Sequence, residues 1–217
     1  MKEIYFIVLM LLGCVGFSQE VNQTDSQGRK QGEWKKYHEN GKLRYVGHFK
    51  NNVPTGEFKY FYNSGGLQSK LNHKKNGASY FIAYYKTGAV KAVGKYIDQK
   101  RDSTWTFYTI EGYKKATEFY IEGLKNRVSY VYYPTGKIAE EKAFFNDFEN
   151  GKWIQYFEDE TKKMEATYVN GGLEGEATYY KTGGKRSIRG YYYHGSRTGV
   201  WLYFEEDGNT IKKKEEY

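Results

Sequence analysis

The four histidines are the first residues to test for chemistry, because an imidazole can act as a general base or as a metal ligand. They stand at His38, His48, His73 and His194. No two of them have the short spacing that brings a pair of ligands onto one zinc ion. Histidines scattered in this way indicate surface or packing roles, so the sequence predicts no metal site.

Acidic and glycine-rich segments give no stronger sign of catalysis. The acidic residues at 140–141 and 158–160 are adjacent, but general acid and base chemistry needs a pocket that shifts their pKa values. The glycine pairs at 171–172 and 183–184 are not followed by a helix, which a phosphate-binding loop requires. We therefore predict a protein that is not an enzyme, with no catalytic residue, no cofactor and no small-molecule substrate.

The segment around the only cysteine, Cys14, differs from the rest of the chain. Lys2 and Glu3 precede an uncharged run at 4–17, which has the length of a signal-peptide core and is shorter than the roughly 20 residues of a spanning helix. Gly16 and Ser18 supply the small residues that signal peptidase needs, and cleavage is expected before Gln19. The sequence thus predicts a signal peptide at 1–18 and export to the periplasm, the outer surface or the medium.

A second route remains open, because 11–14 (Leu-Leu-Gly-Cys) resembles a lipobox whose cysteine becomes a lipidated N-terminus. Cleavage before Gln19 would instead remove the only thiol, which excludes disulfides and zinc–thiolate sites from the mature chain. The net charge is +8, and the loss of Lys2 and Glu3 leaves it unchanged. This charge favours acidic partners, whereas an exported protein is not expected to meet nucleic acid.

The composition indicates strands and turns. The chain has 24 tyrosines, 13 phenylalanines, 4 tryptophans and 25 glycines but only 2 prolines. Aromatic rings favour strands and glycine permits tight turns. Few or no helices are therefore expected.

A repeat of about 24 residues runs through the sequence. The unit that starts at Gly32 sets the pattern: a small residue at the start, a ring two positions later, a second ring five positions later and a turn glycine nine positions later. The other units follow it, with departures at Arg127, Ser129, Glu160 and Ala177. Six of the seven intervals between starts are 24 residues and one is 23. The predicted repeat domain is 32–217, after a lead-in at 19–31, and its units start near 32, 56, 79, 103, 127, 151, 175 and 199.

The second half of most units carries a further ring seventeen positions after the start, with His73 and Glu216 as the exceptions, and its residues alternate with the period of a strand. Leu43, Tyr45, Gly47 and Phe49 fall on one face at period two. Asn and Gly between the two arms tolerate the positive φ of hairpin turns. Each unit is therefore predicted to be a β-hairpin. The predicted structural ring positions are Trp34, Tyr37, Phe49, Phe58, Phe61, Phe81, Tyr84, Tyr96, Trp105, Tyr108, Tyr120, Tyr132, Phe144, Trp153, Tyr156, Tyr168, Tyr180, Tyr192, Trp201 and Phe204.

The spacing of the two rings in the first arm leaves two possibilities. Rings three residues apart would lie on opposite faces of a regular strand, so either a bulge intervenes or both faces carry rings. The rings next to this pattern, Tyr62, Tyr85, Tyr133 and Phe157, are expected to point away from the preceding ring. They form a candidate binding face for protein or glycan.

Segments 28–42 and 192–201 carry a resemblance to a known family. With their Gly-x-Trp and Asn-Gly-Lys patterns, they resemble the MORN repeat variant and the related YwqK-like antitoxin family. The resemblance extends from about Gly28 to the C-terminus. Ser129 and Ala177 depart from it at the first ring, Glu160 departs at the turn glycine, and the second unit is irregular around His73.

This resemblance and the repeat together predict an all-β fold: an elongated, single-layer antiparallel sheet of about eight hairpins, or MORN-like solenoid. Sixteen strands spaced by about 4.8 Å would make it roughly 75 Å long. The expected function is a scaffold that binds a protein partner at the cell envelope, in an antitoxin-like or assembly role. The alternative is a module for surface polysaccharide or anionic lipid headgroups.

Overall fold

The fold was analysed in a computed structural model of the protein that describes residues 20–217. The predicted signal peptide, the cleavage before Gln19 and the lipobox at Cys14 lie outside the described residues. Within 20–217 the structure is all-β, so no helix there could span a membrane.

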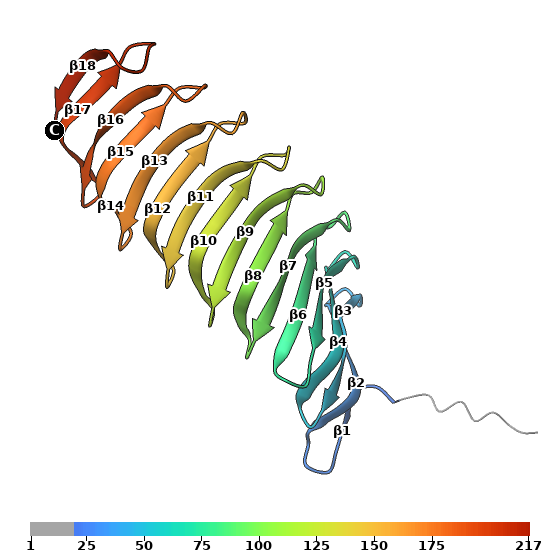
Figure 1. Cartoon of the computed structure of the whole chain (residues 1–217). Helices are drawn as coiled ribbons and strands as arrows, with labels where there is room; N and C mark the ends of the chain where they lie inside the picture. The colour runs from blue at the N-terminus through green and yellow to red at the C-terminus, as the bar shows by residue number, and fades with distance from the viewer. Residues whose placement is uncertain (1–19) are drawn as a thin grey trace, which may run out of the picture.

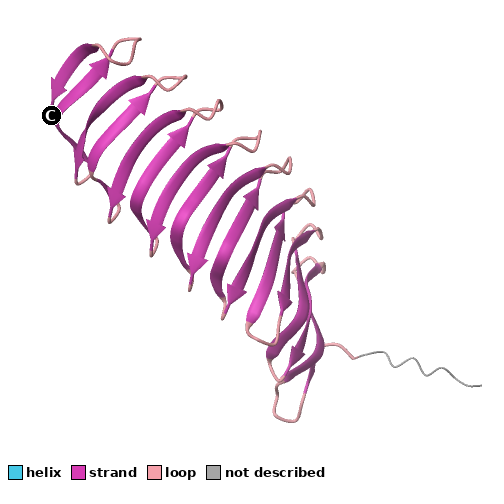
Figure 2. Ribbon diagram, viewed as in Figure 1, coloured by secondary structure: helices cyan, strands magenta, loops and turns pink. Residues whose placement is uncertain are grey.

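Eighteen strands form one open sheet in which each strand pairs antiparallel with its neighbour in the chain, so the predicted fold class is confirmed. Figure 1 shows them side by side in a long row, with β1 and the C-terminal strand β18 at opposite ends, and Figure 2 shows that strands and short turns account for nearly the whole row. The strands are β1 (Gln23–Thr24), β2 (Lys30–Tyr37), β3 (Leu43–Lys50), β4 (Val53–Phe61), β5 (Leu67–His73), β6 (Ala78–Tyr84), β7 (Val90–Ile97), β8 (Lys100–Tyr108), β9 (Lys114–Ile121), β10 (Leu124–Tyr132), β11 (Ile138–Phe145), β12 (Phe148–Tyr156), β13 (Lys162–Val169), β14 (Gly172–Leu173), β15 (Gly175–Tyr180), β16 (Arg186–Tyr193), β17 (Ser196–Phe204) and β18 (Ile211–Glu216).

Two short strands account for the difference from the sixteen expected. β14 pairs with the end of β13 and is continued by β15, so the two together form the first arm of one hairpin. β1 pairs with β2 at the N-terminal edge of the sheet. The remaining strands form the other arms of eight successive hairpins.

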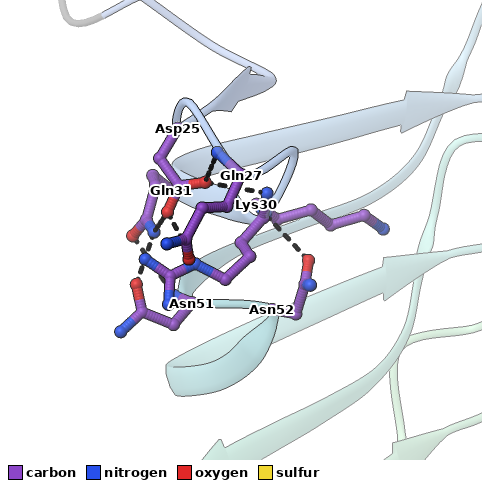
Figure 3. Close-up of polar contacts among 7 residues, drawn as sticks. Asp25, Gln27, Lys30, Gln31, Asn51 and Asn52 are labelled. Atoms are coloured by element: carbon purple, nitrogen blue, oxygen red, sulfur yellow. Dashed lines mark hydrogen bonds and ion pairs between the residues drawn. The ribbon is translucent and has the colours of Figure 1, made fainter.

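The N-terminal edge is closed by a polar cluster, drawn in Figure 3. The Asp25 carboxylate accepts hydrogen bonds from the Gln27 and Arg29 amides and from the side chains of Arg29 and Gln31. Asn52, in the next turn, accepts a hydrogen bond of 2.8 Å from the Lys30 amide. The hydrogen bonds to the Asp25 carboxylate lower its pKa to about 2, and the bond from the Arg29 amide contributes most. The lead-in is thereby attached to the first repeat.

Two kinds of turn alternate along the sheet. Within a hairpin the turn is wider, as where the His38 amide donates to the Lys42 carbonyl. Between hairpins the turn usually has two residues, both with positive φ, as at Asn51-Asn52 and Asn146-Asp147. Such turns match the twist of antiparallel strands. All the two-residue turns lie along one long edge, because successive strands run in opposite directions.

The two rings of the first arm lie on opposite faces, which answers the question left open by the sequence. The Tyr156 hydroxyl donates to Glu141, which pairs with Ile154 and so shares a face with Tyr156, whereas Trp153 lies on the other face. A register shift is also present next to the second ring of each unit, as between Gln155 and Tyr156. We call the face of Trp34, Trp105, Trp153 and Trp201 the indole face, and the opposite one the tyrosine face.

Trp105 and Trp201 are almost completely buried although the sheet has a single layer. Each covers a glycine of the preceding strand, and a Cβ on Gly94 or Gly190 would lie 2.2 Å from the indole. Between Val93 and Lys95 the partner strand spans Thr106 to Asp102, so the arriving strand has two additional residues there. This bulge and the missing Cβ let the ring fold over the strand before it.

Most unit starts have positive φ angles, and Ser103, one of them, lies within the bulge. Seven of the eight starts have φ between 59° and 109°, and five of these are glycines, which adopt such angles readily. The exception is Ser79. β5 and β6 pair without a register shift, and the turn between them is of the wider kind, with the Lys74 amide bonded to the Ala78 carbonyl. The single 23-residue interval of the sequence falls at this junction.

Candidate functional site

A row of exposed apolar side chains follows the edge that holds the two-residue turns. Ile121 faces Leu124 across one turn and Phe145 faces Phe148 across the next. The two phenylalanines are 60% and 63% exposed. We call the set the turn row; its members are Ile97, Ile121, Leu124, Phe145, Phe148, Val169 and Tyr193.

The turn row is on the tyrosine face, where Val128, Tyr191 and Val200 are also exposed. With roughly 150 to 250 Å² for a large ring and less for an aliphatic side chain, these ten residues expose on the order of 900 Å². The largest apolar patch of a typical monomer is about 300–600 Å². One side of an ordinary protein–protein interface buries about 800 Å², which makes this surface large enough for a partner.

A groove lies on the indole face at the irregular β5–β6 junction. Its volume is about 880 Å³, and its walls include Pro54, Tyr60, Leu71, His73 and Tyr96. The turns 74–77 and 98–99 form part of its rim and contribute Lys74, Lys75 and Asp98. The groove combines aromatic walls with charges of both signs.

Lysine or arginine side chains cover the rings of the indole face in most other units. Arg101 lies 4.5 Å from the Trp105 ring and donates a 2.9 Å hydrogen bond to the Tyr120 hydroxyl. Arg197 covers Trp201 at 4.2 Å. Lys30 and Lys125 lie 4.6 Å from the rings of Trp34 and Phe144. All four stand two residues before a unit start, and we call them the cation caps.

His73 lies at the base of the groove. Its Nδ1 is 2.8 Å from the Ser79 Oγ, and its ring packs edge-on against Phe58 with centroids 5.2 Å apart. Its Nε2 is buried and has no hydrogen-bond partner within 20–217. Burial lowers the pKa of His73, so the ring is neutral at pH 7. A catalytic triad would need a carboxylate to orient this imidazole, and the described residues provide none at Nε2.

The other histidines are far apart in the sheet. The His38 Nε2 is 3.0 Å from the Phe61 carbonyl, His48 is exposed, and the His194 Nδ1 lies 3.0 Å from Glu174 in a turn. Within 20–217, no three His, Cys, Asp or Glu residues gather closely enough to hold a metal ion.

The acidic residues noted in the sequence make local contacts. Glu140 accepts a hydrogen bond from Gln155, and Glu141 accepts one from Tyr156. Asp159 accepts from Thr161 within a turn, and these bonds lower the pKa of Asp159. Glu160 pairs with Lys137 at 3.5 Å and occupies the turn-glycine position with φ 69°.

The predicted binding-face tyrosines are half-buried and hydrogen-bonded within the sheet. Tyr62, Tyr85 and Tyr133 donate to the carbonyls of Tyr84, Tyr108 and Tyr156, at 2.7, 2.8 and 2.7 Å. Each bond links a wider turn to the next unit. Phe157 is half-buried too and lacks a hydroxyl. A binding role for these four residues remains a prediction, in addition to the structural role of the tyrosines.

The predicted structural rings divide between the two faces. First-arm rings two residues after a start include the buried Phe58, Trp105 and Trp201, while Phe81 and Trp153 are half-buried. Return-arm rings pack against them, as Tyr192 does against Trp201 at 5.2 Å. The second first-arm rings lie on the tyrosine face, and Tyr37 is 54% exposed.

The residue eleven positions before each first ring is the signal that the sequence reading missed. Where that position holds glycine, as at Gly47, Gly94 and Gly190, a large ring covers it. Where Glu118 or Ala166 stands there, the ring is replaced by Ser129 or Ala177. Lys142 is an exception, because it pairs directly with Trp153, which keeps its ring and is half-buried. At Ser129 and Ala177 the smaller residue compensates for the volume of the strand before it.

One comparison with known proteins bears on the repeat. The family model of the MORN repeat variant matches residues 30–51, 54–75 and 149–170, so these segments of the chain are repeats of the MORN-variant type. No curated protein matches it.

Among solved structures, a chain entitled "Crystal Structure of TcdB2-TccC3-Cdc42" is similar, with 9% identity and a TM-score of 0.19. The match covers 83% of this chain but only 13% of that one. A TM-score this low carries no argument about fold or function.

Proposed function

We propose that this protein is a non-enzymatic, exported repeat scaffold that binds a protein partner at the cell envelope. The turn row is the observation that carries the proposal. Its three rings are more than half exposed, and together with Val128, Tyr191 and Val200 it exposes about the area of one side of a protein interface. Aromatic residues placed in this way are the typical anchors of protein partners.

The repeat architecture supports the non-catalytic part of the proposal. In a stacked-repeat protein each unit contacts only its neighbours, so the row of units presents a long surface that is available for binding. The resemblance to YwqK-like antitoxins adds a finer version, in which the partner is held and neutralised by the sheet.

The test is a crosslinking pull-down from envelope extract with the chain from Gln19, tagged at its C-terminus. We expect one stoichiometric protein partner, which should be lost in the double variant Phe145→Asp, Phe148→Asp. Tyr113→Asp is the matched control, because Tyr113 is 51% exposed at the opposite edge of the sheet. Capture that is unchanged in the double variant would contradict the proposal.

Binding to surface polysaccharide or anionic lipid is the second candidate, and the net charge of +8 favours it. In that case no protein would be captured, and the bait would sediment with wall material or anionic liposomes. Because exposed charges are screened over about 8 Å at physiological salt, this retention should weaken as salt is added.

A further inference from the structure

The groove at the β5–β6 junction lies where two adjacent units both have no cation cap. Unit 2 has Pro54 and unit 3 has Gly77 two residues before the start, where four units have Lys30, Arg101, Lys125 or Arg197; units 6 and 7 have Glu149 and Leu173 there. Within 20–217, no lysine or arginine lies over Phe58, Tyr60, Phe81 or Tyr96 in the way that Arg101 covers Trp105, although Lys91 lies 5.7 Å from the Tyr85 ring near the wider turn. The groove occupies the volume that such a side chain would fill.

The rings of unit 2 match those that a cap covers elsewhere. Phe58, Tyr60 and His73 hold the same unit positions as Trp105, Phe107 and Tyr120, which Arg101 covers at 4.5, 6.0 and 5.2 Å. In unit 2 the rings are also mutually packed, with Phe58 and Tyr60 centroids 6.3 Å apart. Burial lowers the pKa of His73 and so leaves no positive charge at the base of the groove.

Asp98 adds a negative charge at the place of the missing cap in unit 3. A Cβ on Gly77, from which a cap side chain would begin, would lie 3.0 Å from the Asp98 Oδ1. Lys74 and Lys75 extend from the exposed turn at the rim, so the groove has charges of both signs, and the Asp98 carboxylate is the one beside the position of the missing cap. Arg101, which also reaches the Tyr96 hydroxyl, does not line the groove.

We propose that this groove binds an arginine side chain of a protein partner, with the guanidinium over the rings of Tyr60 and His73 and paired with Asp98. A guanidinium stacks on aromatic faces and forms a directed ion pair with a carboxylate. The capped units of this chain place a cation over rings four times, twice with arginine (Arg101 and Arg197) and twice with lysine (Lys30 and Lys125), so a cation is an occupant that the fold accepts elsewhere. The inference deepens the proposed protein-binding function by naming a chemical group of the partner.

The test compares two tripeptides, Ac-Gly-Arg-Gly-NH2 and the same peptide with citrulline, a neutral side chain of nearly the same shape. Binding to the protein is followed by NMR shifts of the Tyr60 and Tyr96 ring signals. We expect the arginine peptide to bind at least tenfold more tightly. Equal binding of the two peptides would overturn the proposal.

Variants locate the site. Pro54→Arg should fill the groove from within and weaken arginine-peptide binding at least tenfold, and Asp98→Asn should weaken it severalfold. Val200→Arg is the matched control, since it adds the same charge at an exposed valine on the opposite face that does not line the groove. Pro54→Arg that binds as well as Val200→Arg would contradict the site even though the peptide binds.

Methylguanidine distinguishes the source of the group. We expect the tripeptide to bind more tightly because its backbone also contacts the groove, whereas equal affinity for methylguanidine would overturn a protein side chain as the occupant. None of these measurements uses the turn row. Failure of the groove can therefore be told apart from failure of the proposed scaffold function.

Discussion

Two neighbouring junctions of the sheet, β7–β8 and β5–β6, solve the same packing problem in different ways. At β7–β8 a two-residue turn is followed by Ser103 with φ 59°, a bulge, and Trp105 folded over Gly94. At β5–β6 the turn is wider, the register is continuous, and Phe81 lies directly opposite Leu71. The first junction buries its ring almost completely, and the second leaves a groove.

The comparison shows that burial in a single-layer sheet depends on backbone geometry as much as on ring size. The bulge directs the arriving strand so that its ring covers the preceding strand. This requires a residue without a Cβ in the preceding strand, beneath the ring. Where Leu71 replaces that glycine, the ring stays in its own strand. A change of one residue in the repeat length therefore accompanies the change from a closed surface to an open one.

The largest expected effect is that of removing the covering ring at the regular junction. Trp105 is 1% exposed, so Trp105→Ala should destabilise the protein by about 3–5 kcal/mol. Phe81→Ala, at the open junction, should cost clearly less because Phe81 is half-buried. Trp153→Ala should cost several kcal/mol, between these two. Urea unfolding followed by circular dichroism measures all three, and equal losses for Trp105 and Phe81 would contradict the comparison.

The glycine under the ring is the next most sensitive position. Gly94→Ala places a Cβ 2.2 Å from the Trp105 ring, and the forced shift should cost about 1–3 kcal/mol. Gly66→Ala is the control, because its Cβ would meet no atom within 4 Å and its φ is not positive. A thermal unfolding midpoint that drops equally in both variants would show that close ring packing is not the cause.

Loss of a hydroxyl that joins two units should have a smaller effect. Tyr85→Phe removes the 2.8 Å hydrogen bond to the Tyr108 carbonyl and should cost about 1 kcal/mol. Tyr80→Phe is the control, because Tyr80 is exposed and its hydroxyl makes no hydrogen bond within the described residues. Chemical unfolding should show an unchanged stability for this control, and an equal loss of stability there would exclude the hydrogen bond as the reason.

The smallest expected effect is alkaline destabilisation of the C-terminal units. Burial first, and then hydrogen bonds to Glu141 and Glu165, raise the pKa values of Tyr156 and Tyr180 to about 12. Because the unfolded value is near 10, this stability is complete below pH 10 and is lost as pH rises toward 12. Melting temperatures between pH 9 and 11 should fall less steeply for Tyr156→Phe than for the parent protein. Parallel curves would contradict this assignment.

The sequence predicts the hairpins well because their signals are local. Asn51-Asn52 and the glycine-containing turns mark the reversals, and the alternation from Leu43 to Phe49 marks a strand. The eighth unit illustrates a limit: an additional residue in its turn places Tyr217, rather than Glu216, opposite Gly199. A residue-by-residue count along the repeat cannot show which strand absorbs an insertion.

The groove and the turn row could not be predicted in the same way. The groove depends on Pro54 and Gly77 at positions where four other units have cation caps. The absence of a cap there can be recognised only when it is known which rings the caps cover. The turn row joins Ile97, Phe148 and Tyr193 from separate hairpins. Their alignment follows from all the two-residue turns being on one edge, a property of the assembled sheet.

The chain-order pairing of the strands also determines how the molecule would respond to tension. The backbone hydrogen bonds of an antiparallel pair run perpendicular to the strands, which here is along the row from β1 to β18. A pull on the two ends therefore loads these bonds one after another and separates hairpins singly, as in unzipping. Each repeat of 24 residues would release roughly 80 Å of chain. A molecule anchored at one end could thus extend stepwise under low force and refold unit by unit.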